Sequence, residues 1–300
     1  MRRIQYERFG GPEVLEIAEV DPPTPGPGRI RIRVHAAGVN AMDWKRRDGL
    51  MAKGPLEQPR GVGNDAAGVV EELGEGVTGV KVGDRVFGVG PSTFAEQAVL
   101  SSWAPLPHHV SFEEGAATPV PFETAVRMLA AVDAREGDTI VVSGAAGGVG
   151  TAVIQLARAR GMIVIGTASA SNQEYVEALG ALATTYDDGW VDRVRELAVA
   201  EVNAGLDLAG AGVIPQLIEL TGDPARVVSI ADASAPELGA KATFGGGDMP
   251  AALREASRLM ETGELRMVVE ETYPLDRTPE AQRRSKEGHG RGRAVVLPGR

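Results

Sequence analysis

The sequence contains no cysteine among its 300 residues, so it can form neither a disulfide framework nor a thiolate zinc site, and nothing in it points to an oxidising compartment. No stretch approaches the roughly 18 to 20 apolar residues that a membrane-spanning helix needs, and no apolar signal core opens the chain. There is no long run of lysines and arginines, and the formal net charge is -10, so nucleic acid or an anionic membrane would be repelled. We expect a soluble, cytoplasmic protein whose partner is a small organic molecule.

The 300 residues, of which 43% are hydrophobic, are enough for one large domain or two ordinary ones, and we expect two. The N-terminal third contains short β-like runs interrupted by glycine and proline, and this spacing predicts an antiparallel, barrel-like domain. The sequence pattern changes at residues 112–129. Beyond them, strand patterns alternate with helix patterns, which predicts a parallel sheet covered by helices on both faces. Residues 288–298 return to a strand pattern. The predicted fold class is therefore α/β, with a doubly wound parallel sheet beside the antiparallel domain.

A glycine-rich turn follows the predicted strand at residues 139–143. Gly147, Gly148 and Gly150 stand where this strand must turn tightly into a helix, and without Cβ atoms the backbone N–H groups at the helix start can approach an anion closely. Helical apolar spacing and a second strand pattern follow, which completes a β-α-β unit. The spacing is A-x-G-x-x-G, with Ala145 in the first position, and its alternative is an ordinary tight turn. The residues expected to bind the pyrophosphate of a dinucleotide are Ala145, Ala146, Gly147, Gly148, Val149 and Gly150.

The end of the second strand of this unit decides between NAD and NADP. An Asp or Glu there would hydrogen-bond the ribose hydroxyls of NAD and repel a 2'-phosphate. The sequence has no acidic residue until Glu174, so NADPH is permitted, but no Arg or Lys lies in the loop to bind the phosphate strongly. We expect NADPH as cofactor, with NADH possible and only a modest preference between them. The polar residues available for these contacts, unless they are merely solvated, are Thr167, Ser169, Ser171 and Asn172.

Several segments in a fixed order carry a family resemblance, which is more specific than one glycine fingerprint. They are "PGPGRIRIRVHAAGVNAMDWKRRDG", "GNDAAGVVEELGEGVTGVKVGDRVFG", "SGAAGGVGTAVIQLA" and "GHGRGRAVVLP". Together they resemble the zinc-independent quinone oxidoreductases of the medium-chain dehydrogenase/reductase superfamily, over nearly the whole chain. The resemblance implies a GroES-like catalytic domain at residues 1–118 and 270–300 and a Rossmann dinucleotide-binding domain at residues 119–269. It also implies that NADPH is used to reduce quinones, enones or enoyl thioesters.

Comparison with the zinc-dependent branch of that superfamily tests whether this sequence has the residues of a zinc site. Its alcohol dehydrogenases carry a catalytic Cys and a His at positions that correspond here to Asn40 and Asn64. Zinc prefers thiolate, imidazole and carboxylate ligands. No ligand spacing is found among the histidines, which are His35, His108, His109 and His289. We therefore expect no zinc, and a substrate that its own conjugation activates because no Lewis acid polarises it.

The resemblance also assigns individual residues to the reaction. Asn40 and Thr124 should lie near the nicotinamide, and Lys45, with Arg47 beside it, falls where a cation or donor could steady a developing enolate. The alternatives are a turn residue for Asn40 and solvated surface for the basic pair. Tyr186 matches a tyrosine beside the adenosine phosphate, or else it is a half-buried aromatic at a strand end. Backbone contacts to the cofactor are expected at the ends of two later strands, from Ala209, Ile230 and Ala231.

The predicted reaction transfers a hydride to a quinone, an enone or another conjugated carbonyl compound without a metal. Two alternatives stay open, an enoyl-thioester reductase of a biosynthetic pathway and a non-enzymatic NADPH-binding protein. A homodimer is expected, although the edge strand through which relatives pair holds three consecutive glycines within residues 240–253, and glycine weakens a strand.

Overall fold

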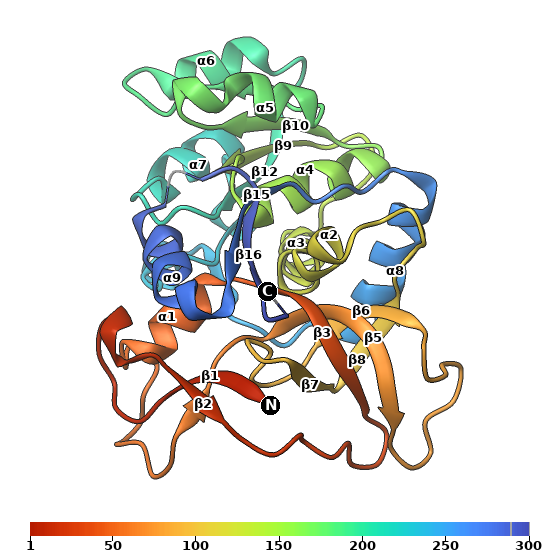
Figure 1. Cartoon of the computed structure of the whole chain (residues 1–300). Helices are drawn as coiled ribbons and strands as arrows, with labels where there is room; N and C mark the ends of the chain where they lie inside the picture. The colour runs from red at the N-terminus through yellow and green to blue at the C-terminus, as the bar shows by residue number, and fades with distance from the viewer. Residues whose placement is uncertain (289, 300) are drawn as a thin grey trace. The chain divides into compact units, whose positions relative to one another are not determined.

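The computed structural model describes residues 1–288 and 290–299, so His289 lies outside the described residues. The chain divides into two compact units, and Figure 1 labels many of their helices and strands. The first unit comprises residues Met1–Val120 and the chain from Met249 onward, and the second unit is Pro121–Asp248. No helix of the described chain combines the length and the apolarity that crossing a bilayer requires.

The boundary between the second unit and the returning C-terminal segment differs from the sequence-based one at residue 270. Helix α8 (Met249–Thr262) belongs to the first unit, because it packs against strand β8 (Ser102–Pro105). Ser257 Oγ donates to the Pro105 carbonyl at 2.7 Å, and the His109 ring lies 3.2 Å from the Met260 carbonyl. The helical periodicity of α8 is the same whichever unit it covers, so the sequence pattern could not show this contact.

The first unit contains a sheet with the strand order β15-β16-β3-β5-β6-β8, in which β7 also pairs with β3. All of its pairs are antiparallel except β15 with β16, which confirms the antiparallel first domain. A second sheet has the order β2-β1-β4. The strands are β1 (Arg2–Tyr6), β2 (Glu16–Glu19), β3 (Ile30–Gly38), β4 (Arg60–Gly61), β5 (Asp65–Leu73), β6 (Arg85–Val89), β7 (Gln97–Leu100), β8, β15 (Val269–Pro274) and β16 (Arg293–Leu297).

Alternation along β3 explains why this segment is a strand with one face in the core. Ile30, Ile32 and Val34 are buried, whereas Arg31 and Arg33 between them point away from the core. The helices of this unit besides α8 are α1 (Ala41–Arg47), α2 (Phe112–Ala116), α9 (Thr278–Glu287) and the short η1 (Pro12–Val14) and η5 (Leu275–Arg277). Helix α1 packs against α9, so the N-terminal and C-terminal segments share one core.

The second unit is built on a parallel sheet with the strand order β11-β10-β9-β12-β13-β14, which confirms the predicted doubly wound domain. Its strands are β9 (Thr139–Ser143), β10 (Ile163–Thr167), β11 (Leu182–Thr184), β12 (Val202–Asp207), β13 (Val227–Ser229) and β14 (Lys241–Ala242). Its helices are α3 (Pro119–Ala131), which begins in the first unit, α4 (Gly148–Ala159), α5 (Gln173–Ala178), α6 (Trp190–Leu197), α7 (Ile214–Thr221) and the short η2 (Ala170–Asn172), η3 (Pro224–Arg226) and η4 (Ala235–Leu238).

The strand order reverses direction at β9, which pairs with β10 on one side and with β12 on the other. In such sheets ligands bind in the crevice beyond the carboxyl ends of the strands on either side of this switch point. Ser143, Thr167 and Asp207 are in register at those ends. The sheet therefore places the glycine turn after β9 between the loops that follow β10 and β12.

Candidate functional site

The glycine turn that joins β9 to α4 has two kinds of glycine. A Cβ at Gly150 would lie 2.3 Å from the Ala145 carbonyl oxygen, so this glycine allows the helix to pack on the preceding turn. A Cβ at Gly147 would meet only the Gly144 carbonyl oxygen, at 3.6 Å, and Gly147 is the extended residue that precedes the first turn of α4. The N–H groups of that first turn have no acceptor within the helix. The space in front of Gly147 is therefore suited to an anion bound by these groups.

A buried carboxylate organises the loops at the carboxyl ends of β12 and β13. Asp207 Oδ1 accepts hydrogen bonds from the backbone N–H groups of Ala209, at 3.1 Å, and Gly210, at 3.0 Å. Ser229 Oγ donates to Asp207 Oδ2 at 2.7 Å and accepts from Ala231 N at 3.0 Å. The backbone of the predicted contact residues Ala209 and Ala231 is thus fixed by one carboxylate and one hydroxyl.

A backbone bond fixes Ile230, because its N–H donates to the main-chain carbonyl of Asp207 at 3.1 Å. Sequence reasoning assigned only backbone contacts to this region and missed Asp207 and Ser229. The available signal was a polar residue at the last position of each of two mostly apolar strands.

The loop after β10 presents hydroxyl groups, as predicted for the adenosine end of a dinucleotide. Thr167 is buried at the strand end, and Ser169 Oγ lies 3.2 Å from Ser171 Oγ in an exposed part of the loop. Asn172 is buried at the start of α5. Gln173 Nε2 donates to the Ala168 carbonyl at 2.8 Å and holds the loop against the strand. The structure therefore leaves the two serines as the most accessible polar groups of this set.

Tyr186 lies in the neighbouring loop after β11, and its side chain is 55% exposed. The guanidinium of Arg193 in α6 holds this loop, because it donates to the Thr184 hydroxyl at 3.0 Å and to the Asp187 carbonyl at 3.0 Å. Arg193 is a cation that the sequence analysis did not consider, since it lies well beyond the residues searched for a phosphate ligand. Its donors already serve backbone carbonyls, so its role in the structure is to shape the loop that carries Tyr186.

Thr124 is buried in α3 of the second unit. The Arg127 side chain, one turn later, donates to Thr124 Oγ1 at 3.3 Å and pairs with Glu123 at 2.9 Å. Arg127 also donates to the Thr243 hydroxyl, and this hydrogen bond links the residue after β14 to α3. Thr124 is therefore held in one orientation by a charged network within its own unit.

Asn40 is buried between β3 and α1 in the first unit, next to two buried carboxyl groups. Its side-chain Nδ2 donates to Asp65 Oδ2 at 3.1 Å, and its backbone N–H donates to Asp43 Oδ2 at 2.7 Å. Arg293 of β16 pairs with Asp65 Oδ2 at 3.5 Å. Val120 N also donates to this oxygen, at 3.4 Å. Asn40 is thus the N-cap residue of α1, and its side-chain amide belongs to a buried charged cluster.

Burial dominates the titration of this cluster. Desolvation raises the pKa of Asp43 to about 7, and the negative charge of Asp65 adds to this rise. Desolvation also raises the pKa of Asp65 to about 6, although Arg293 and the Asn40 amide act in the opposite direction. The pKa of the Arg293 guanidinium is lowered by the same burial. Two carboxyl groups of the first unit can therefore hold protons at neutral or slightly acidic pH.

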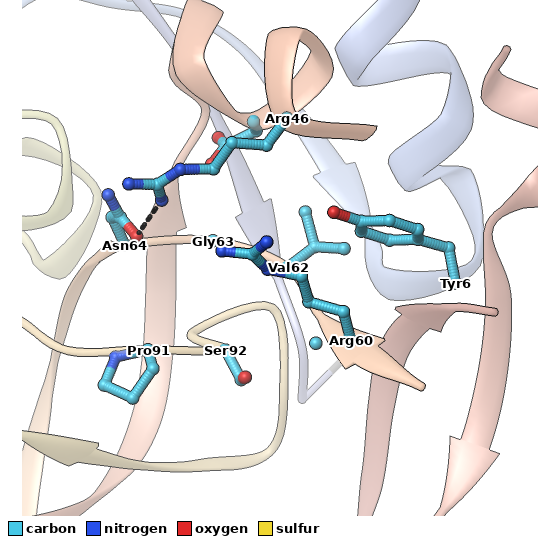
Figure 2. A pocket seen from close by; sticks show the side chains of 10 residues that line it. Tyr6, Arg46, Arg60, Val62, Gly63, Asn64, Pro91 and Ser92 are labelled. Atoms are coloured by element: carbon cyan, nitrogen blue, oxygen red, sulfur yellow. Dashed lines mark hydrogen bonds between the residues drawn. The ribbon is translucent and has the colours of Figure 1, made fainter. Parts of the chain in front are cut away.

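A pocket of about 140 Å³ lies beside this cluster in the first unit. Figure 2 shows the side chains of Tyr6, Arg46 and Arg60 pointing into the same space, with Arg46 hydrogen-bonded to Asn64. The other lining residues are Asp43, Gly61, Val62, Gly63, Pro91 and Ser92. Sequence analysis did not single out Tyr6, Arg46 or Arg60, because no motif marks them.

The neighbouring basic residues of α1 have other surroundings. Lys45 Nζ lies 5.6 Å from the centre of the Trp44 ring, and Lys45 does not line the pocket. Arg47 is fully buried, which rules out the solvated surface considered for it: it pairs with Asp48 and donates to the Gly10 carbonyl at 3.1 Å. The role of Lys45 at the reacting carbonyl stays a prediction.

The two positions that correspond to zinc ligands do not fit that metal. Asn40 and Asn64 offer amides, whereas zinc prefers thiolate, imidazole or carboxylate ligands. Asn64 Oδ1 already accepts from the Arg46 guanidinium at 3.0 Å, and a cation there opposes a second one. Over residues 1–288 and 290–299, no three His, Asp or Glu side chains gather as metal ligands.

Comparison with known proteins agrees with this architecture. Residues 26–104 match the model of the alcohol dehydrogenase GroES-like domain, and residues 179–296 match that of the zinc-binding dehydrogenase family. The two matches, with the antiparallel and parallel sheets described above, define the class: a medium-chain dehydrogenase/reductase with a GroES-like and a Rossmann-like domain.

Relatives that match nearly the whole chain show which family of this class the protein belongs to. The quinone oxidoreductase of Mus musculus is 31% identical over 99% of this chain and 97% of its own length. The structure of the quinone oxidoreductase from Coxiella burnetii superposes with a TM-score of 0.85 at 29% identity, and covers 99% of both chains. That of the Escherichia coli quinone oxidoreductase complexed with NADPH gives a TM-score of 0.86 at 25% identity, over 99% of this chain and 100% of that chain. The chain belongs to the quinone oxidoreductase family, which confirms the resemblance and the predicted class of NAD(P)H-dependent oxidoreductase.

Proposed function

We propose that the protein binds NADPH at the glycine turn and reduces a conjugated carbonyl compound, a quinone or an enone, without a metal ion. The observation that supports this most is the turn itself. Gly150 allows close packing of α4, whereas Gly147 leaves the start of α4 open to an anion. Open space at the start of a helix, next to a tightly packed turn, suits a bound pyrophosphate.

Each group of residues in the second unit has its own part in cofactor binding. The first-turn N–H groups of α4, with Ala145 and Ala146 before them, would hold the pyrophosphate. The Asp207–Ser229 network would keep Ala209, Ile230 and Ala231 in place along the crevice. The hydroxyl groups of Ser169 and Ser171, with Tyr186 nearby, would face the adenosine end.

The residues of the reaction itself are proposed as donors. When bound, the nicotinamide supplies a hydride for the β-carbon of the conjugated carbonyl, and the negative charge then builds on the substrate oxygen. Asn40, Thr124 and Lys45 are the proposed groups near the reacting atoms, where preorganised donors stabilise such a charge. The Asp65 carboxylate orients the Asn40 amide. Water is the proposed source of the proton that returns to the α-carbon.

The experiment that tests cofactor binding compares two glycine variants by calorimetry. Gly147→Val should fold normally, because position 147 is extended and nothing but one oxygen lies near its Cβ, yet the side chain would block the anion. NADPH affinity should fall at least about tenfold, a loss of about 1.4 kcal/mol. Gly150→Ala is the contrasting variant, and it should lower stability because its Cβ meets the Ala145 carbonyl. Unchanged NADPH affinity in a folded Gly147→Val protein would overturn the proposed site.

The substrate is tested by a panel of quinones, small enones and enoyl thioesters, with NADPH oxidation as the signal. Turnover of quinones or enones supports the proposal. Turnover of thioesters alone would support a biosynthetic enoyl reductase, and NADPH binding with no turnover at all would support a non-enzymatic protein.

A homodimer and a cytoplasmic location are proposed with the function. The edge strand β14 is short, and Phe244 just after it is 62% exposed, an apolar group that a partner could cover. Light scattering during gel filtration measures the assembly directly. A monomer at micromolar concentration would overturn the dimer.

A further inference from the structure

We propose that the pocket lined by Tyr6, Arg46 and Arg60 binds a carboxylate group, and that the substrate is therefore a conjugated carbonyl compound that carries a carboxylate. The statement about the substrate rests on the proposed reductase function. The statement that the pocket binds a carboxylate does not, because it concerns one unit of the protein and equilibrium binding alone.

The first argument is uncompensated positive charge. Among the residues that the structure describes, Arg46 and Arg60 have no carboxylate oxygen within 4.0 Å, and Arg46 donates only to the neutral Asn64 amide. By contrast, Arg47 pairs with Asp48 and Arg293 pairs with Asp65. A protein with a net charge of -10 has many acidic residues to pair with arginines. Two unpaired guanidinium groups at one pocket are thus a site ready for an external anion.

The second argument is an unsatisfied donor. The Tyr6 side chain is only 2% exposed, and its hydroxyl has no hydrogen-bond partner among the described residues. Buried polar groups nearly always have a partner, so this hydroxyl, which lies at the pocket, is available to a ligand bound there. Burial raises the pKa of Tyr6, while the charges of Arg60 and Arg46 act against the rise. The phenol therefore keeps its proton at neutral pH and can donate it to a carboxylate oxygen.

The third argument is the size and stiffness of the pocket. Its backbone wall is pressed onto the neighbouring loop: a Cβ at Gly61 would lie 2.1 Å from Ser92 Oγ, and one at Gly63 would lie 2.4 Å from Thr93 Oγ1. Ser92 itself has a positive φ of 60°, an uncommon conformation outside glycine. A volume of about 140 Å³ is too small for a whole ligand of ordinary size and suits one functional group. The lining offers two guanidinium groups and one phenol as donors, and the two oxygens of a carboxylate can accept from such groups.

The Asp43 carboxyl also lines the pocket and would repel an anion if it were ionised. Its Oδ2 atom is turned toward the Asn40 N–H, from which it accepts at 2.7 Å. Burial raises its pKa to about 7, so near neutral pH a large fraction of the molecules hold this group uncharged. Near neutral pH Asp43 therefore cancels at most part of one of the two guanidinium charges.

The binding experiment uses benzoate and benzamide as probes on the full chain, with titration followed by NMR or calorimetry. Benzoate should bind saturably and benzamide at least about tenfold more weakly, since the neutral amide offers one acceptor and no charge. Arg46→Met and Arg60→Met should each weaken benzoate at least about tenfold. Tyr6→Phe should weaken it several-fold while the protein stays folded. Arg254→Met is the matched control, because exposed Arg254 in α8 removes the same charge away from the pocket and should leave benzoate binding unchanged.

The kinetic experiment compares 4-carboxybenzalacetone with its methyl ester, two enones that differ in charge but not in the reacting group. The kcat/KM ratio of acid to ester should exceed about ten in the wild type and approach one in Arg46→Met. Benzoate binding that depends on Arg46, without reduction of either enone, would uphold the carboxylate site and overturn its link to the proposed reaction. Benzoate binding that Arg46→Met and Arg254→Met change equally, or that does not saturate, would overturn the site itself, whatever the reductase assay shows.

Discussion

Replacing Asp43 with Asn should change how the stability of the protein depends on pH. Asp43 is 3% exposed, and its pKa is raised from 3.8 to about 7, chiefly by burial. The folded state therefore holds a proton that the unfolded chain releases near pH 4. Because the folded state binds more protons in this range, the free energy of unfolding must fall as the pH rises from about 4 to about 7, and it levels off above.

The size of this loss of stability follows from the difference between the folded and unfolded pKa values of Asp43. Each unit of pKa difference is worth about 1.4 kcal/mol, and the difference is close to three units, so the upper limit is about 4 kcal/mol. We expect about 2 to 4 kcal/mol, since relaxation and water penetration reduce the cost of a buried charge. Asn at position 43 keeps an acceptor for the Asn40 N–H but carries no charge, so the variant should lack this loss. Asp65, whose pKa is about 6, contributes a second, narrower loss that the variant retains.

Urea unfolding followed by tryptophan fluorescence at pH 5, 6, 7 and 8 measures these curves. The advantage of Asp43→Asn over the wild type should already be present at pH 5 and should grow by about 2 to 3 kcal/mol between pH 5 and pH 8, because most of the loss from Asp43 ionisation falls in that range. The control is Asp21→Asn, a change at an exposed position, whose curve should run parallel to the wild type. If Asp43→Asn also gives a parallel curve, Asp43 is ionised in the folded protein throughout, and the reasoning from burial is wrong.

Three further predictions concern other parts of the molecule. Arg293→Met should destabilise the protein by about 3 to 5 kcal/mol near neutral pH, because it leaves the buried Asp65 without its cation, and the double variant with Asp65→Asn should recover much of this loss in the same unfolding assay. Metal analysis of the purified protein should find no stoichiometric zinc, and a chelator should leave reductase activity intact; activity that a chelator removes and zinc restores would contradict this. Ser171→Arg should raise selectivity for NADPH over NADH by about tenfold to a hundredfold, chiefly through tighter NADPH binding, because one charge-assisted hydrogen bond is worth roughly 1.5 to 3 kcal/mol. Titration of both nucleotides against parent and variant decides this last point, and an unchanged ratio would mean that the 2'-phosphate lies in another loop.

The sequence alone predicted the features that depend on neighbouring residues. The alternation along β3 and the strand, glycine turn and helix around Gly147 are local patterns, and both are present in the structure. The pocket was not predictable in this way. Lys45, Arg46 and Arg47 are consecutive helical residues, so each points in a different direction, and only the packing of α1 shows that Arg46 lines the pocket while Arg47 is buried.

Contacts between segments that are distant in the chain could not be predicted from the sequence either. Arg293 and Asp65 are separated by 228 residues, and no local pattern pairs them. The place of α8 in the first unit depends in the same way on its contact with β8. The role of Asp207 could have been predicted from the sequence. A carboxylate at the end of a buried strand needs hydrogen-bond partners, and the next strand of the sheet ends with a hydroxyl group.

The pairing of Arg293 with Asp65 has a consequence for the order in which the protein can be made. A ribosome delivers Asp65 before the second unit and Arg293 only after the whole of the second unit has emerged. Until then, the Asp65 carboxyl has no counter-charge, and β3 lacks its neighbour β16. The second unit, which is continuous in the chain, can fold while the first is still incomplete. The buried cluster that orients Asn40 therefore cannot be complete before Arg293 has emerged, so a chain that stalls before residue 293 can hold a complete second unit while the first unit is unfinished.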